Sequence, residues 1–243
     1  MNAIKATQAT LQCVVLAGGL LVSHMSEAAA TASREFAAAL RAQPDVNRGA
    51  TLFRECAACH GAGGMGTEEG NVPRIAGQHA SVLIRQLVDY RYERRWDIRM
   101  EHFAGRHILG SPQEIADVAA YAAQLIGDGP RNVGDGELAE HGAGLYAHQC
   151  AECHGSSGEG NDKDVVPILA GQHYEYLLRQ MYDAIEGRRP NFSRSHVRLL
   201  ARLERDDLVG IADYLSRLDW PDTRQPTSDG REEEAPTRAS PGD

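Results

Sequence analysis

The chain has 243 residues and a formal net charge of −9, because 34 acidic side chains outnumber 25 basic ones. This acidic balance excludes nucleic acid as a partner. After residue 30 no segment approaches the roughly 18 consecutive apolar residues of a transmembrane helix, so we expect no membrane span there.

The first thirty residues have the pattern of a secretory signal peptide. Lys5 precedes an apolar stretch at 11–22, and small residues follow at 28–32. The apolar stretch is too short to cross a membrane. We expect cleavage of residues 1–30 and export to the periplasm, which would also remove Cys13. An uncleaved amphipathic anchor is the alternative.

The four remaining cysteines lie in two C-x-x-C-H motifs, at 56–60 and 150–154. This spacing is typical of covalent c-type haem attachment, because two thiols must reach the two vinyl groups of one porphyrin while the adjacent histidine binds the iron. A zinc site would need further ligands at its own spacing. The sequence therefore predicts two covalently bound haem c groups, attached through Cys56, Cys59, Cys150 and Cys153, with His60 and His154 as proximal iron ligands.

The two halves of the chain repeat each other at a shift of 94 residues. The shift brings the A-G-Q-H segment at 76–79 onto the one at 170–173, and Pro73 onto Pro167. A repeat that continues without a gap into the following helix indicates duplicated domains. We expect domain 1 at 31–127, a turn-rich linker at 128–136, domain 2 at 137–220 and a disordered acidic tail at 221–243.

Each half predicts helices and no strand. The last helix of the first half has the clearest start, because Ser111 offers an N-cap, Pro112 suits the first helical position and Glu114 completes a capping box. An apolar stripe follows along the same helix. The other expected helices lie at 48–55, 79–92, 141–149, 173–186 and 206–218.

With these motifs, the P-x-x-A-G-Q segments and the closing helices at 115–121 and 208–214, the chain resembles the cytochrome c4 family over residues 45–220. The resemblance implies an all-α fold of two tandem cytochrome c-like domains, each wrapped around one covalently attached haem. It also implies a periplasmic carrier of single electrons between respiratory redox partners. In that family the carbonyl of a loop proline holds the proximal imidazole. The resemblance therefore implies that Pro73 and Pro167 orient His60 and His154.

The distal iron ligands depart from the family, whose members place a methionine at each haem. After Tyr182 the chain has no Met, Lys or Cys, and His196 is its one histidine. We therefore expect His196 as distal ligand of haem 2, the alternative being a surface histidine beside an open iron. For haem 1, Met100 fits the family pattern, whereas the 94-residue shift places His102 on His196. The choice between Met100 and His102 stays open, with His107 as a third candidate.

The leading hypothesis is an electron-transfer protein with protein redox partners and no catalytic residues. The alternative is a dihaem redox enzyme, or a haem subunit of a dehydrogenase, acting on a small sulfur, nitrogen or peroxide substrate at an open second haem. The acidic surface predicts partners with basic docking patches. Any membrane association is expected to come through a partner.

Polar residues around the middle helices have two interpretations each. Five arginines are candidates for binding the haem propionates, because a guanidinium matches carboxylate geometry; exposed charges at helix ends are the alternative. His79 and His173 are interpreted as polar residues that satisfy backbone groups at helix starts; a proton-linked or iron-ligating histidine is the alternative. The five arginines are Arg91, Arg94, Arg95, Arg188 and Arg189.

Overall fold

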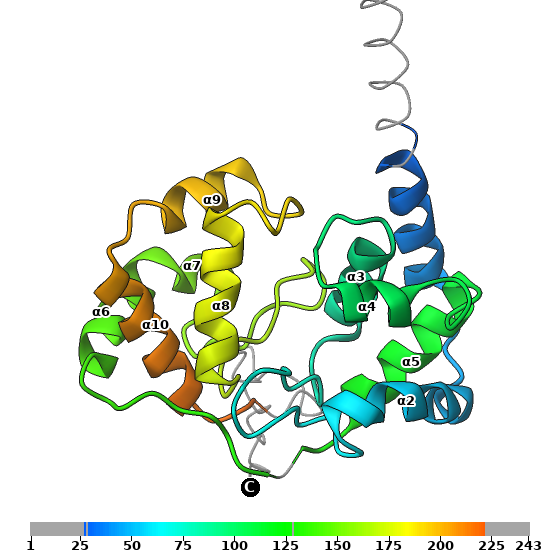
Figure 1. Ribbon diagram of the computed structural model, residues 1–243, viewed down its shortest axis with the longest axis horizontal. Coiled ribbons are helices and arrows are strands. Elements are labelled where there is room, and N and C mark those ends of the chain that lie inside the picture. The colour runs from blue at the N-terminus through cyan, green and yellow to red at the C-terminus, as the bar shows by residue number, and fades with distance from the viewer. Residues whose placement is uncertain (1–26, 28, 128, 222–243) are drawn as a thin grey trace, which may run out of the picture.

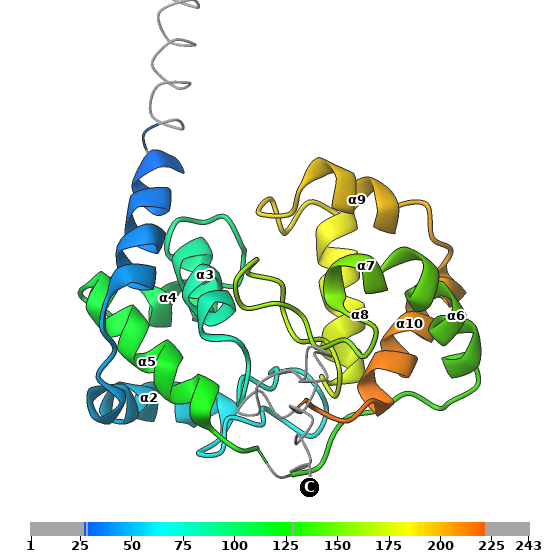
Figure 2. The same ribbon diagram turned by 180° about the vertical axis from the view of Figure 1, so that it is seen from behind.

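The computed structural model describes residues 27, 29–127 and 129–221. Two helical domains lie side by side (Figures 1 and 2). The single β pairing within these ranges is the isolated bridge between Asn161 and Val166, so the all-α prediction is confirmed. No helix in these ranges is long and apolar enough to cross a membrane. Nearly all of the predicted signal peptide (1–30) and acidic tail (221–243) lies outside the described residues.

Each domain repeats one helical pattern. Domain 1 contains a helix at 29–41 followed by α2 (Val46–His60), α3 (Ala80–Arg91), α4 (Ile98–Ala104) and α5 (Pro112–Gln124). Domain 2 contains α6 (Ala139–Gln149), α7 (Ala151–His154), α8 (Tyr174–Ile185), α9 (Arg194–Leu200) and α10 (Arg205–Arg217).

In each domain the last helix closely crosses the helix that leads to the haem motif, α2 in domain 1 and α6 in domain 2, and this crossing places the motif. In domain 1 a Cβ added to Gly49 of α2 would lie 2.1 Å from the carbonyl oxygen of Asp117 in α5. In domain 2 Gly142 and Gly210 meet in the same way. Only glycine lets the backbones approach this far. Because the first C-x-x-C-H motif forms the last five residues of α2, the crossing fixes the position of that motif.

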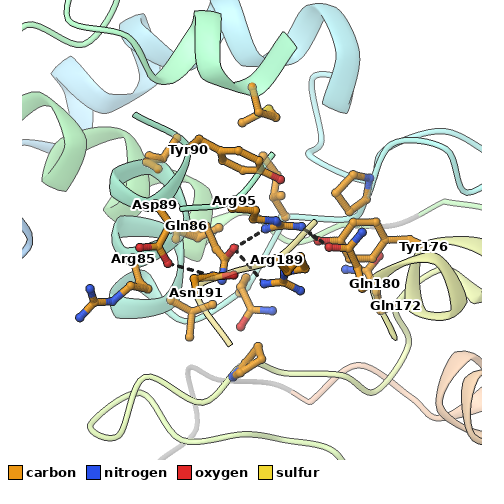
Figure 3. Close-up of a pocket in the computed structure, with 18 of the residues that line it drawn as sticks. Arg85, Gln86, Asp89, Tyr90, Arg95, Gln172, Tyr176, Gln180, Arg189 and Asn191 are labelled. Carbon is orange, nitrogen blue, oxygen red and sulfur yellow. Dashed lines mark hydrogen bonds between the residues drawn. The ribbon is translucent and has the colours of Figure 1, made fainter. Parts of the chain in front are cut away.

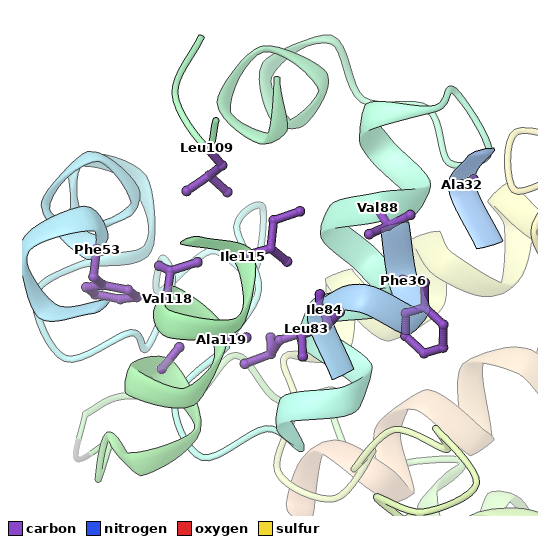
Figure 4. Close-up of a cluster of buried hydrophobic side chains, with 12 residues drawn as sticks. Ala32, Phe36, Phe53, Leu83, Ile84, Val88, Leu109, Ile115, Val118 and Ala119 are labelled. Carbon is purple, nitrogen blue, oxygen red and sulfur yellow. The ribbon is translucent and has the colours of Figure 1, made fainter. Parts of the chain in front are cut away.

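The helix at 29–41, which starts inside the predicted signal boundary, belongs to the core of domain 1. Its Ala32, Phe36 and Ala39 are buried in the same cluster as residues of α3 and α5 (Figure 4). The carboxylate of Glu35 on this helix is also buried and pairs with Arg91 of α3. The N-terminal helix is therefore an additional element of domain 1, and the hydrophobic pattern of the sequence did not predict it.

The expected helices agree with the structure where local signals were strong. Ser111 caps α5 and accepts a hydrogen bond from the Glu114 N–H at 3.3 Å, as predicted. The predicted capping box is not completed, because the Glu114 carboxylate accepts from the Gly110 N–H instead. The middle helices α3 and α8 each lie within one residue of their expected ends. The short helices α4 and α9, which follow the middle helices, were not predicted, and they carry the candidate distal ligands.

Candidate haem-binding sites

One continuous cavity of about 1060 Å³ contains both C-x-x-C-H motifs. Its volume exceeds the roughly 300–1,000 Å³ of a typical single-ligand pocket. The two middle helices α3 and α8, the two loops after the haem motifs and the distal helices all contribute to its walls. Six motif side chains line it: Cys56, Cys59, His60, Cys150, Cys153 and His154.

The first motif presents its histidine in the form that an iron ligand requires. His60 is 6% exposed, and its Nδ1 lies 2.9 Å from the carbonyl oxygen of Pro73, to which it can donate. Burial lowers the pKa of His60 and favours the neutral imidazole, whose free Nε2 lone pair can bind a metal. The apolar surroundings of Cys56 raise its pKa to about 11, an environment that suits an uncharged thioether.

The second motif has a similar environment with one difference. Burial, together with the nearby imidazole of His196, lowers the pKa of His154 to about 4. The carbonyl of Pro167 lies close enough to act on that pKa, but the buried Nδ1 of His154 makes no hydrogen bond of ordinary geometry to any residue that the structure describes. The burial of Cys150 likewise raises its pKa to about 11.

His196 lies across the cavity from His154. The two ring centres are 6.1 Å apart. Two imidazoles that share one metal between them place their ring centres about 6 Å apart, since a metal–nitrogen bond is about 2 Å and the nitrogen lies about 1 Å from its ring centre. Burial and the charge of Arg189 lower the pKa of His196 and favour its neutral form. The pair fits a six-coordinate iron between two imidazoles.

Of the candidate distal ligands in domain 1, Met100 lines the cavity, whereas His102 and His107 lie outside it. Met100 lines the cavity on α4. His102 is exposed and is absent from the lining; its Nδ1 lies 3.2 Å from Nε2 of His107, which is also exposed. The structure therefore brings Met100 to the same cavity as His60, and it brings His102 and His107 only to each other.

A change of register explains why His102 and His196 are not equivalent in space. α3 and α8 are related by 94 residues, but α4 and α9 are related by 96. Three residues stand between Arg189 and the N-cap Ser193, whereas one stands between Arg95 and the N-cap Asp97. With this two-residue insertion, Met100 and His196 are each the third residue of their helix.

Three of the five candidate arginines pair with carboxylates of the protein. Arg91 pairs with Glu35, and Arg94 lies 3.5 Å from Asp89. Arg188 is half exposed and pairs with Asp183 at 2.7 Å. These three therefore provide structural ion pairs.

Arg95 and Arg189, which the 94-residue shift relates, lie buried where the domains meet (Figure 3). Arg95 of domain 1 donates to the Tyr176 hydroxyl at 2.6 Å and to the Gln180 amide oxygen at 2.5 Å, both in domain 2. Nε of Arg189 has no partner within the described residues. Burial, with repulsion from Arg95, lowers the pKa of Arg189 to about 9. Two buried cations, one incompletely paired, fit the carboxylates of haem propionates.

Comparisons with known proteins agree with this site. The cytochrome c family model matches residues 46–125 and 139–219. Cytochrome c4 of Pseudomonas aeruginosa is 32% identical over 182 residues, which cover 72% of this chain and 89% of that protein. A thiosulfate dehydrogenase electron acceptor of Stutzerimonas stutzeri is 32% identical, covering 70% and 82%. The crystal structure of reduced recombinant cytochrome c4 from Pseudomonas stutzeri gives a TM-score of 0.64 at 27% identity, over 73% of this chain and 100% of that one. The chain therefore belongs to the cytochrome c4 family of dihaem electron-transfer proteins.

Proposed function

We propose that the protein is a periplasmic electron carrier whose two domains use different distal ligands. Domain 1 holds its haem iron between His60 and Met100, and domain 2 between His154 and His196. The observation that carries this proposal is the 6.1 Å separation of the His154 and His196 ring centres. Met100 is the third residue of α4, as His196 is of α9, and it lines the same cavity. Its position supports the assignment in domain 1.

Unequal ligands give the molecule a direction. When bound, each haem takes up and releases one electron at its iron. A His/Met pair holds the iron at a higher potential than two imidazoles do. An electron therefore prefers domain 1, so domain 2 is the entry side and domain 1 the exit side. The position of His196 also supports a carrier over an enzyme with an open second haem, because the imidazole takes the place that a substrate would need.

The entry side has a local charge opposite to that of the whole chain. Arg194, Arg198 and Arg202 follow one another at intervals of four residues, on one face of α9 and the turn after it. All three are exposed, and none forms an ion pair with a described residue. They lie on the element that carries His196. We therefore propose that an acidic electron donor docks here, since complementary charge speeds encounter.

The relatives suggest a class of donor. One relative is named as the electron acceptor of a thiosulfate dehydrogenase. That name supports a periplasmic dehydrogenase as the kind of protein that delivers electrons to domain 2.

The proposal is tested by counting the ligand pairs in the oxidised, haem-loaded protein. Low-temperature EPR together with near-infrared magnetic circular dichroism distinguishes His/His, His/Met and high-spin haems. One His/His and one His/Met signature are expected. Two His/His signatures would overturn the assignment of Met100, and a high-spin haem would overturn that of His196 and favour the enzyme alternative.

A further inference from the structure

The repeated A-G-Q-H segments reach across the boundary between the domains. The side chain of Gln172 accepts a hydrogen bond from the Arg74 N–H at 3.0 Å and donates to the Arg74 carbonyl at 2.8 Å. Gln78 makes the same two bonds to Ile168, both at 3.0 Å. Both glutamines are buried. Because all four positions obey the 94-residue shift, an approximate two-fold axis relates the two contacts.

Each glutamine holds the peptide unit that faces a proximal histidine. The Arg74 N–H and the Pro73 carbonyl belong to one planar peptide. That carbonyl lies 2.9 Å from Nδ1 of His60. A chain of hydrogen bonds thus runs from Gln172 in domain 2, through one peptide, to His60 in domain 1.

The histidines of the same segments hold a second peptide unit. Nε2 of His173 lies 2.7 Å from the Met65 carbonyl oxygen, and as this oxygen can only accept, Nε2 is the donor. The N–H of that peptide, on Gly66, donates to the carbonyl of His60 at 2.8 Å.

The contact related to it by the approximate two-fold axis is formed in domain 2. Nε2 of His79 lies 2.9 Å from the Glu159 carbonyl oxygen, and the Gly160 N–H donates to the carbonyl of His154 at 2.9 Å. Each proximal histidine is therefore linked through single peptides to residues of the other domain.

We propose that these contacts make Gln172 and His173 positioning residues for His60, and Gln78 and His79 positioning residues for His154. Hydrogen bonds in a chain polarise one another, and the groups behind a ligating imidazole fix its orientation and basicity. The potential of each haem then depends on the docking of the opposite domain. This role goes beyond carrying electrons and holds for either choice of distal ligand.

The two sets of contacts differ in how they reach the proximal imidazole. The chain from Gln172 ends in a hydrogen bond to Nδ1 of His60, whereas Nδ1 of His154 is close to the Pro167 carbonyl but makes no hydrogen bond of ordinary geometry within the described residues. Loss of Gln172 is therefore expected to affect haem 1 more than loss of Gln78 affects haem 2.

The test is a crossed experiment on the full-length, haem-loaded protein. Gln172→Met keeps the side-chain volume and removes both hydrogen bonds to Arg74. Its expected result is a higher reduction potential of haem 1, because a less basic imidazole stabilises the oxidised iron less, with haem 2 unchanged. Gln78→Met is expected to raise only haem 2, and by less. Spectroelectrochemical titration measures both potentials.

A second readout separates positioning from loss of folding. With ¹⁵N-labelled histidine, NMR of the reduced Gln172→Met protein is expected to show faster exchange of the His60 Nδ1–H and unchanged exchange at His154. Gln172→Glu retains the oxygen that accepts from Arg74, so it is expected to keep haem 1 at or below its original potential.

The control is Gln113→Ala, which removes two hydrogen bonds inside domain 1, to the Gln43 carbonyl at 2.7 Å and to the Asp117 carboxylate at 2.9 Å. It is expected to move neither potential. Three outcomes would overturn the proposal. The reduction potential could shift only for the haem in the substituted residue's own domain, it could shift equally for both haems, or it could stay unchanged in both Met variants.

Discussion

The imidazole of His196 is supported by its neighbours in the loop before α9. It stacks on Phe192, with ring centres 4.7 Å apart and planes inclined by 16°. The guanidinium carbon of Arg189 lies 4.1 Å from the centre of the same phenyl ring. Phe192 lies between Arg189 and the N-cap Ser193, in the segment that is two residues longer than its counterpart before α4. The insertion that changes the register therefore also supplies the aromatic ring that restrains the histidine.

His196→Ala is expected to convert haem 2 to a high-spin state and to leave haem 1 low-spin, because it removes the imidazole whose ring centre lies 6.1 Å from that of His154. EPR of the oxidised variant measures this change. His102→Ala is the matched control, since His102 is exposed and contacts His107. Two low-spin haems in the His196→Ala protein would contradict the ligand assignment.

The buried imidazole of His173 makes the stability of the molecule depend on pH. Burial, with a contribution from Arg74, lowers its pKa, although the Met65 carbonyl acts the other way. Nδ1 also accepts a hydrogen bond from the Asn132 N–H at 3.1 Å, which a proton would displace. The unfolded chain binds this proton at about pH 6.5 and the folded chain only at lower pH. Its contribution is therefore complete above pH 6.5 and is lost as the pH falls below it.

Urea unfolding is expected to show lower stability at pH 5 than at pH 7, with a slope of up to about 1.4 kcal/mol per pH unit from this one group. His173→Gln is expected to reduce that slope. The exposed His148, changed to Gln, serves as the control and leaves the slope as it was. An equal slope in both variants would show that other groups cause the acid sensitivity.

At the scale of elements, the N-terminal helix braces the distal segment of domain 1. Glu35 pairs with Arg91, and its other oxygen accepts from Arg106 at 2.9 Å and from the Tyr92 hydroxyl at 2.6 Å. Arg91 in turn donates to the carbonyl of Ala104, the last residue of α4, at 2.7 Å. The helix therefore stabilises the end of the element that carries Met100.

Glu35→Ala is expected to destabilise domain 1 by about 3 kcal/mol, because removing one partner of a buried ion pair leaves the other charge uncompensated. Thermal unfolding followed at the absorption band expected of the proposed His60/Met100 pair measures this change. Loss of that band should precede loss of the haem 2 signals.

Glu68→Ala is the control for this prediction, since Glu68 is exposed and forms no ion pair within the described residues. Equal effects of the two substitutions would rule out the bracing role of the N-terminal helix.

At the scale of the whole molecule, the two domains act as one electron-transfer unit. Their haem motifs open into one cavity, and Arg95 and Arg189 meet there from opposite domains. The net charge of −9 describes the chain as a whole, whereas α9 presents a basic face. The total charge predicts partners with basic docking patches, whereas the basic face of α9 predicts an acidic donor at that surface.

Reversing the charge of that face, with Arg198→Glu and Arg202→Glu together, is expected to slow reduction by an acidic donor about tenfold or more at low salt. The loss should diminish as salt rises, because salt screens the attraction. Stopped-flow reduction by an acidic electron-transfer protein measures the rate. Arg41→Glu, on the exposed side of the N-terminal helix, is the control. An equal loss in the control would point to net charge and not to docking at α9.

The sequence by itself determined the cofactor, the two-domain plan and the cytochrome c4 family. The cofactor and the helix starts depend on short-range patterns: two thiols and a histidine within five residues, and a helix start set by Ser111 and Pro112. The two-domain plan depends on a 94-residue repeat that runs without a gap from the haem motif through the middle helix, and such a repeat can be read directly along the chain. The comparisons and the fold confirm them.

Only the tertiary structure decided which side chains face the cavity and how the domains depend on one another. The 94-residue shift paired His102 with His196, but two extra residues before α9 rotate the helix register and bring Met100 to that place. The partners of His79 and His173 lie 80 and 108 residues away. Contacts across such distances have no local sequence signal, because folding creates them by docking two domains that are each complete in their own pattern.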